Sequence, residues 1–270
     1  MTITSFNDHI REKVTGNMNY VLITGGTSGI GYELARQFAK NNYNVIIASG
    51  NMQKLQSAKA KLEQEFNVNV IALQQNLSQL DGAMNLYRTV KEMKIKVSVL
   101  VNNAGVGVTG SFETVDVKQE ENMLVLNMVN LTQLTKLFIK DMYHRKEGMI
   151  LNVASTGAFQ PGPYTSTYYA SKAYVLSLSR ALRYEAKKKG VQVCTLCPGA
   201  TSTEFFARAG KALPAVAMSA EKVASIAYTG LMNNKEIIVP GLGNKILRLI
   251  PTKIRIIGIA KYQMGLMKRR

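Results

Sequence analysis

Length, composition and charge exclude several classes of protein. The chain has 270 residues, of which 46% are hydrophobic and 19% are charged, so it can bury a full core and is neither disordered nor fibrous. The formal net charge is +17, and eight basic residues follow Glu236, the last acidic residue. A basic end of this kind can bind nucleic acid, anionic lipid or an anionic substrate.

Short aliphatic runs alternate with longer segments of helical periodicity. Strands are expected at 20–24, 44–48, 68–73, 97–101, 149–153, 191–196 and 236–240, and helices at 30–40, 52–65, 79–93, 117–143, 165–189 and 220–233. Strands that are buried on both faces and joined by helices predict a doubly wound parallel sheet of about seven strands, with helices on both faces. No linker interrupts the alternation. We therefore expect one α/β domain at 20–240, between an N-terminal arm at 1–19 and a C-terminal extension at 241–270.

The N-terminus, the cysteines and the histidines limit location and metal chemistry. The first eighteen residues are polar and mixed in charge, without the apolar run of a signal peptide, so a cytoplasmic location is expected. Cys194 and Cys197 lie three apart in a strand-like run, where side chains point to opposite faces, so two separate buried thiols are predicted. His9 and His144 are the only histidines. No metal site is therefore expected.

A glycine-rich loop directly follows the first predicted strand. Residues 24–31 read TGGTSGIG and lead straight into a helix. Glycines let the backbone approach a pyrophosphate closely, and the free amides and dipole at a helix N-terminus attract its charge. A glycine cluster can also be merely a tight turn between a strand and a helix. The strand, loop and helix context favours a dinucleotide-binding loop.

Four further motifs follow in order. Asn102-Asn103-Ala104-Gly105 comes after the fourth strand and Ser155 after the fifth; Tyr168 and Lys172 belong to YYASK; and Pro198-Gly199 precedes Thr203. With the glycine spacing TGxxxGxG and with Asn127 in a predicted helix, this pattern resembles the classical short-chain dehydrogenase/reductase family over approximately 20–240. The resemblance implies a Rossmann fold and an oxidoreductase that moves hydride between a nicotinamide and a ketone or secondary alcohol. It also implies a catalytic tetrad, made of Asn127, Ser155, Tyr168 and Lys172.

The chemistry of the tetrad explains its residue types. Tyr168 and Lys172 are four apart on a helix and project from one face, and a nearby ammonium should lower the pKa of the phenol. Ser155 would donate a hydrogen bond to the substrate oxygen while Tyr168 gives or takes the proton. The resemblance places Lys172 on the ribose hydroxyls and a water on Asn127. Each residue alone has an ordinary structural explanation, but the order and spacing of all of them favour catalysis. Tyr169 is the competing base, and its i+4 neighbour is Ala173.

The expected cofactor contacts gather at the ends of strands. They are Gly25, Thr27, Ser28, Gly29, Ile30, Gly31, Ser49, Gly50, Asn51, Asn76, Leu77, Asn103, Ala104, Gly105, Tyr168, Lys172, Pro198, Gly199, Thr201 and Thr203. Residues 48–51 read ASGN, without the carboxylate that binds the adenosine ribose in NAD-dependent folds. NADP(H) is therefore favoured, with Ser49, Asn51 and Lys54 as candidates for its phosphate. The arginine common in NADP-binding relatives is also missing, which leaves NAD(H) open.

Residues 203–218 are expected to form a lid over the substrate. This segment offers the apolar side chains Phe205, Phe206, Leu213, Val216 and Met218. An apolar lid suits a hydrophobic ketone or alcohol such as a steroid, a bile acid or a 3-oxoacyl group. Ser155, Tyr168, Phe205 and Phe206 are the expected substrate contacts. The alternative is that these side chains only pack the lid against the core.

The basic C-terminal segment at 253–270 has helical periodicity. Its apolar residues gather on one side of a helical wheel: Ile256, Ile257, Ile259, Ala260, Met264, Leu266 and Met267. Charges and glycines interrupt it too often for it to span a bilayer. It could rest on an anionic membrane surface, or pack on the domain or at a subunit contact.

Two other functions compete with the enzyme. A nucleotide-binding regulator without catalysis could use the same fold, with its basic surface serving nucleic acid, but it would be expected to have lost part of the tetrad. A nucleotide-sugar epimerase is disfavoured by the glycine spacing and the modest length. We therefore expect no nucleic acid as a partner, and the resemblance implies a homodimer or homotetramer.

Overall fold

One seven-stranded parallel sheet forms the centre of the molecule. The computed structural model describes residues 19–209, 214, 216–247 and 250–267. The strands are β1 (Tyr20–Thr24), β2 (Asn44–Ser49), β3 (Val70–Gln74), β4 (Val97–Asn102), β5 (Gly148–Val153), β6 (Val191–Leu196) and β9 (Ile237–Ile238). They pair in the order β3-β2-β1-β4-β5-β6-β9, and every pair is parallel. The predicted single-domain α/β fold is confirmed.

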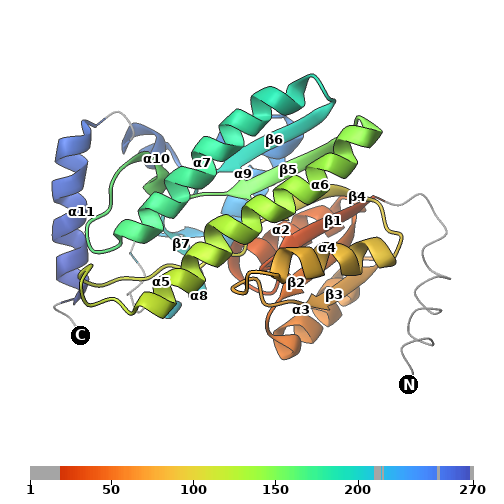
Figure 1. The fold of residues 1–270 in the computed structure, drawn as a ribbon, viewed down its shortest axis with the longest axis horizontal. Helices are drawn as coiled ribbons and strands as arrows, with labels where there is room; N and C mark the ends of the chain where they lie inside the picture. Colours follow the sequence, from red (N-terminus) through yellow and green to blue (C-terminus); the bar gives the residue numbers. More distant parts are fainter. Residues whose placement is uncertain (1–18, 210–213, 215, 248–249, 268–270) are drawn as a thin grey trace.

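Helices cover both faces of this sheet (Figure 1). One buried cluster joins the sheet to α2 (Gly29–Lys40), α3 (Met52–Glu65) and α9 (Ala220–Met232). The other joins it to α4 (Gly82–Glu92), α6 (Leu131–Arg145) and α7 (Ser166–Lys187). The strands are buried on both sides, which explains why they read as continuous aliphatic runs.

The predicted helix at 117–143 is interrupted. It consists of α5 (Val117–Leu124), a π-helical turn η1 (Val125–Asn130) and then α6. A π turn shifts the direction of the side chains that follow, and such turns often occur at functional sites. Asn127 lies within it.

Several short elements at the C-terminal side of the sheet were not predicted. The strands β7 (Thr201–Ser202) and β8 (Met218–Ser219) pair in parallel and hold together the two ends of the segment expected to form the lid. Within it lies α8 (Glu204–Arg208), and a 3-10 turn η2 (Thr156–Phe159) follows β5. The chain continues past β9 into α10 (Leu242–Leu247), which was not predicted either, and into α11 (Thr252–Met267), which corresponds to the helical periodicity predicted at 253–270. Leu213 lies outside the described residues.

Helix α11 packs on the domain with one face. Ile256, Ile259, Ala260 and Met264 are half-buried on that face, whereas Ile257 is 57% exposed. The side chains of Leu266 and Met267 and residues 268–270 lie outside the description, so the predicted apolar face is only partly assigned. Within the described ranges, no helix is both long and apolar enough to cross a membrane.

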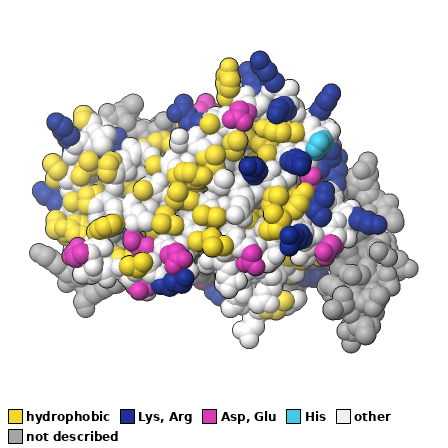
Figure 2. Space-filling view, in the orientation of Figure 1, with side chains coloured by type: hydrophobic (Ala, Val, Ile, Leu, Met, Phe, Trp, Pro, Cys, Tyr) yellow, Lys and Arg dark blue, Asp and Glu magenta, His cyan; other side chains and the backbone are white. Residues whose placement is uncertain are grey.

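The surface and the cysteines complete the description. Figure 2 shows basic side chains scattered over the visible face with acidic ones among them, and a broad band of hydrophobic side chains across its middle. Cys194 and Cys197 form no disulfide and are buried in two different clusters, so the prediction of separate thiols is confirmed. No three His, Cys, Asp or Glu side chains group as metal ligands in the described part of the chain.

Candidate active site

A cleft of about 660 Å³ opens at the carboxyl ends of the central strands. This is the place where open α/β sheets bind ligands, because the strand order reverses there. Predicted site residues that line it are Gly25, Ser28, Gly29, Ile30, Ser49, Gly50, Asn76, Leu77, Asn103, Ala104, Gly105, Ser155, Tyr168, Lys172, Pro198, Gly199, Thr201, Thr203, Phe205 and Phe206. Segments from all along the chain therefore meet in one cavity.

Close backbone packing shapes the nucleotide end of the cleft. Gly25 and Gly29 have φ of 65° and 55°, a region in which side chains are strained. A Cβ added to Gly31 would lie 2.2 Å from the carbonyl oxygen of Gly25. The Asn103 Nδ2 donates hydrogen bonds to the carbonyls of Thr24 (3.0 Å) and Gly25 (3.2 Å). The loop is therefore held in one conformation, and the Ser28 side chain leaves the start of α2 without a side-chain cap.

Three of the predicted cofactor contacts do not line this cleft. Gly31 lies beneath the loop, where its lack of a side chain lets the helix approach Gly25. The Asn51 side chain caps α3 by accepting a hydrogen bond of 2.9 Å from the Lys54 amide. Thr27 lines a smaller neighbouring pocket together with Lys54 and Lys61. Gly31 thus supports the site from below, and Asn51 orders the turn that carries Ser49 and Gly50.

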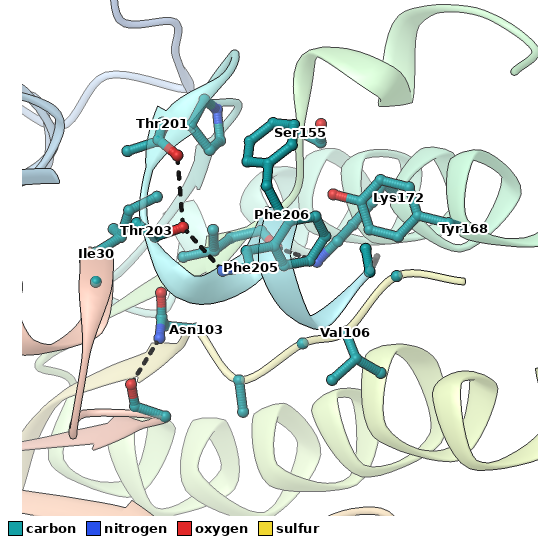
Figure 3. A pocket seen from close by; sticks show the side chains of 18 of the residues that line it. Ile30, Asn103, Val106, Ser155, Tyr168, Lys172, Thr201, Thr203, Phe205 and Phe206 are labelled. Carbon is teal, nitrogen blue, oxygen red and sulfur yellow. Dashed lines mark hydrogen bonds between the residues drawn. The ribbon is translucent and has the colours of Figure 1, made fainter. Parts of the chain in front are cut away.

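Tyr168, Lys172 and Ser155 come together at the other end of the cleft (Figure 3). Tyr168 and Lys172 lie one turn apart on α7, with the lysine Nζ 5.8 Å from the centroid of the tyrosine ring. Lys172 Nζ donates a hydrogen bond of 3.0 Å to the Val153 carbonyl, which fixes it at the end of β5. Ser155 Oγ accepts one of 3.0 Å from the Gly157 amide. The predicted triad of hydroxyl, phenol and amine is assembled.

Asn127 is fully buried behind these residues. Its Nδ2 donates to the Val106 carbonyl (2.9 Å) and to Ser171 Oγ (3.2 Å), and its Oδ1 accepts from the Val106 amide (3.1 Å). Both amide hydrogens are thus used within the protein. The side chain holds the segment after β4 in place, and of its own polar atoms only the second lone pair of Oδ1 is left for the water expected there.

Burial controls the protonation of the two titrating groups. It raises the pKa of Tyr168 to about 12, although a hydrogen bond with Ser155 acts in the opposite direction. Burial also lowers the pKa of Lys172 to about 8. We expected the ammonium to make the phenol more acidic, but both charged forms lose hydration here and that cost dominates. At neutral pH the phenol keeps its proton, so it is set to act as an acid.

The comparisons with known proteins agree with this geometry. The model of the short chain dehydrogenase family matches residues 19–213. The chain belongs to this family. Mouse 17-beta-hydroxysteroid dehydrogenase type 3 is 31% identical over 68% of this chain and 60% of its own length. A zebrafish very-long-chain 3-oxoacyl-CoA reductase is 25% identical over 98% of this chain and 88% of its own.

Solved structures of short-chain dehydrogenases have the same fold as this chain. A short-chain dehydrogenase from Sphingobium yanoikuyae in complex with NADPH has a TM-score of 0.80 at 28% identity, covering 93% of this chain and 95% of that one. A Burkholderia phymatum dehydrogenase in complex with NAD also has a TM-score of 0.80, at 21% identity over 86% and 92% of the two chains. Several of the curated relatives are matched over only about 60% of their length.

The cleft is also lined by residues that the sequence did not point to. Val106, Gly107, Val108 and Thr109 line the cleft, and their place directly after the NNAG motif could have indicated them. Three more come from the C-terminal elements: Asn244, Tyr262 and Gln263. No motif marks these three, because only packing brings α10 and α11 to the cleft.

Proposed function

We propose that this chain is an oxidoreductase that interconverts a ketone and a secondary alcohol with a nicotinamide cofactor. The observation that carries the proposal is the convergence of Ser155, Tyr168 and Lys172 on a cleft whose other end is a glycine loop. The cavity fits a dinucleotide, because it is continuous from Ser49 and Gly50 to Tyr168 and its floor is backbone that side chains would block. Family membership supports the same reaction.

In the reduction of a ketone, Ser155, Tyr168 and Lys172 would each have a different role. The nicotinamide would supply the hydride to the carbonyl carbon. The Ser155 hydroxyl would donate a hydrogen bond to the carbonyl oxygen, and Tyr168 would donate its proton to that oxygen as negative charge develops. Lys172, held by Val153, would orient the ribose and stabilise the resulting phenolate.

We propose that the substrate is bulky and largely apolar. The Phe205 ring lies 5.6 Å from the Tyr168 ring, centroid to centroid, and Phe206 packs on Phe205, so aromatic groups lie beside the proton donor. The names of the mouse and zebrafish relatives point to steroid and fatty 3-oxoacyl carbonyls. The alternative, a lid that only packs on the core, predicts no preference for bulky ketones.

A panel of ketones and alcohols, followed by nicotinamide absorbance with NADPH and with NADH, tests both proposals. We expect turnover, and a higher kcat/KM for steroid or long-chain ketones than for acetone. Absence of hydride transfer with every ketone and alcohol would contradict the enzyme. Equal kcat/KM values for large and small ketones would contradict the bulky substrate.

We propose NADP(H) as the preferred cofactor. The end of β2 carries Ser49 and Gly50 and no carboxylate, so this strand end itself places no negative charge against a 2'-phosphate. Lys54 lies beside this turn and forms an ion pair of 2.8 Å with Glu204 of α8. Replacing Lys54→Met should raise the KM for NADPH about fivefold, as expected for one exposed charged contact, and leave the KM for NADH unchanged. Lys59→Met on the same helix is the control, and an equal effect on both nucleotides would contradict the role.

We further propose a cytoplasmic homo-oligomer. Support for the oligomer is the hydrophobic band over α6 and α7 in Figure 2, together with Tyr174 of α7, which is 37% exposed. Light scattering of the purified chain would give its mass, and a monomer at all concentrations would overturn the idea.

The proposed contact with anionic membranes has support in the exposed Ile254 and Ile257 beside Lys253 and Lys261. If the chain fails to bind acidic liposomes at both low and high salt, the membrane contact is rejected.

A further inference from the structure

Gln263 of α11 is a buried polar residue in the wall of the cleft. It is 3% exposed, it lines the same cavity as Ser155 and Tyr168, and its Oε1 has no hydrogen-bond partner among the described residues. An amide oxygen buried without a partner costs free energy, so native proteins rarely keep one unless a ligand or a water satisfies it. This oxygen therefore points to something that binds there.

Helix α11 is anchored to the loop that carries Ser155. The Arg255 guanidinium donates hydrogen bonds to Gln160 Oε1 (2.7 Å) and to the Phe159 carbonyl (3.2 Å), at the end of the turn that Ser155 begins. Figure 1 shows α11 at one end of the molecule, beside the start of α7. The helix, and Gln263 with it, is thus positioned relative to the reacting groups.

Tyr169 is a neighbour of both Gln263 and the proton donor, and it also lines the cleft. Its ring lies 5.9 Å from that of Tyr168, and it is closely packed, since a Cβ added to Gly162 would lie 2.3 Å from it. Burial raises the pKa of Tyr169, and a hydrogen bond with the Gln263 side chain acts in the opposite direction, so the two side chains are neighbours. The amide oxygen is the part left for another group. Tyr262, also in the wall, adds a second hydroxyl.

We propose that Gln263 is a specificity-determining residue, whose amide oxygen accepts a hydrogen bond from a hydroxyl of the substrate at a distance from the carbonyl. The proposal rests on the proposed function and deepens it. The carbonyl lies at Ser155 and Tyr168, an apolar body packs on Phe205 and Phe206, and a donor group reaches Gln263. The substrate class is thus a hydroxyketone with its two polar groups separated by an apolar frame.

Two ketosteroids that differ only in a hydroxyl on the ring farthest from the ketone provide the test. We expect the native chain to prefer the hydroxylated one in kcat/KM, and Gln263→Leu to lower the ratio of the two values about tenfold, the effect of one hydrogen bond to a buried group. Gln263→Glu keeps an acceptor and should keep the preference. Lys261→Met, on the exposed side of α11, should change neither value.

Two outcomes would overturn the inference. An equal loss for both ketones in Gln263→Leu would mean that the residue only supports the fold, and an unchanged ratio would mean that it does not contact the hydroxyl. Binding of the two ketones, measured by thermal shift without turnover, gives the same comparison independently of catalysis. A chain that turns over no ketone but binds the hydroxylated one more tightly through Gln263 would reject the proposed function and keep this inference.

Discussion

The two ends of the cleft differ in what forms their walls, backbone at one end and side chains at the other. At the nucleotide end, backbone packs on backbone: Gly31 lies against Gly25, and Asn103 holds the loop by its carbonyls. At the substrate end, side chains from α7, α8, α10 and α11 form the wall, and a few contacts such as those of Arg255 hold these elements in place. A backbone site tolerates little change, whereas a side-chain wall can change its residues without losing the fold. The first end suits a cofactor shared by a family, and the second suits a substrate particular to one member.

Replacement of Tyr168 has the largest expected effect, since it removes the proposed proton donor at the junction of the two ends. Tyr168→Phe should reduce kcat about a thousandfold, the range for loss of a general acid, with little change in the Kd for the nucleotide. Steady-state kinetics and nucleotide titration measure the two quantities. Tyr169→Phe, one residue along the same helix, is the matched control and should keep most of kcat.

A methyl group at Gly31 tests whether the nucleotide end really tolerates no change. Gly31→Ala would place the Cβ 2.2 Å from the Gly25 carbonyl oxygen and 2.4 Å from Asn103 Nδ2, with backbone on one side and a hydrogen-bonded amide on the other. Overpacking of this kind should lower the free energy of unfolding by about 2–3 kcal/mol and raise the Kd for the nucleotide at least tenfold. Denaturant unfolding with and without nucleotide measures both. A variant as stable and as tight as the native chain would show that the loop can move.

The pH dependence of the reduction rate tests the order in which Lys172 and Tyr168 lose their protons. Lys172 has a pKa of about 8 and Tyr168 of about 12, so raising the pH discharges the lysine first while the phenol still carries its proton. The rate of ketone reduction should therefore fall as the pH rises through about 8. In Lys172→Arg the charge persists, and any activity that remains should stay level to higher pH. A native rate that is constant up to pH 10 would contradict this assignment.

The lowered pKa of Lys172 also predicts how the free energy of unfolding depends on pH. The pKa of Lys172 is about 8 when folded and near its usual value of 10.5 when unfolded, so between these pH values the unfolded chain binds more protons. The free energy of unfolding should thus gain from this group as the pH rises from about 8 to 10.5. Lys172→Met should lack that contribution in urea unfolding across this range.

The smallest expected effect concerns the exposed side of α11. Apart from the backbone of α11 itself, no atom of the described residues lies within 4 Å of a Cβ added to Gly258, so Gly258→Ala adds no clash and should stabilise the chain by up to about 1 kcal/mol through helix propensity. Thermal unfolding measures it, and kcat should not change. A loss of stability would show that this face of α11 is covered.

The amino-acid sequence by itself determined the sheet, most helices and the nucleotide end. Aliphatic runs give buried parallel strands, and the motifs at 24–31 and 102–105 lie next to the strands that place them, so local patterns are sufficient there. The predicted positions of Ser155, Tyr168 and Lys172 are also brought together, because a strand end and one helical turn fix them.

Only the tertiary structure decided the rest. The π turn at Asn127, the anchoring of α11 by Arg255 and the place of Gln263 in the wall depend on contacts between segments about 100 residues apart or on a local irregularity, and no periodicity encodes either. The pKa values of Tyr168 and Lys172 were also beyond the sequence. Spacing shows that a phenol and an amine are neighbours, but the loss of hydration that opposes both charges depends on what the whole fold packs around them.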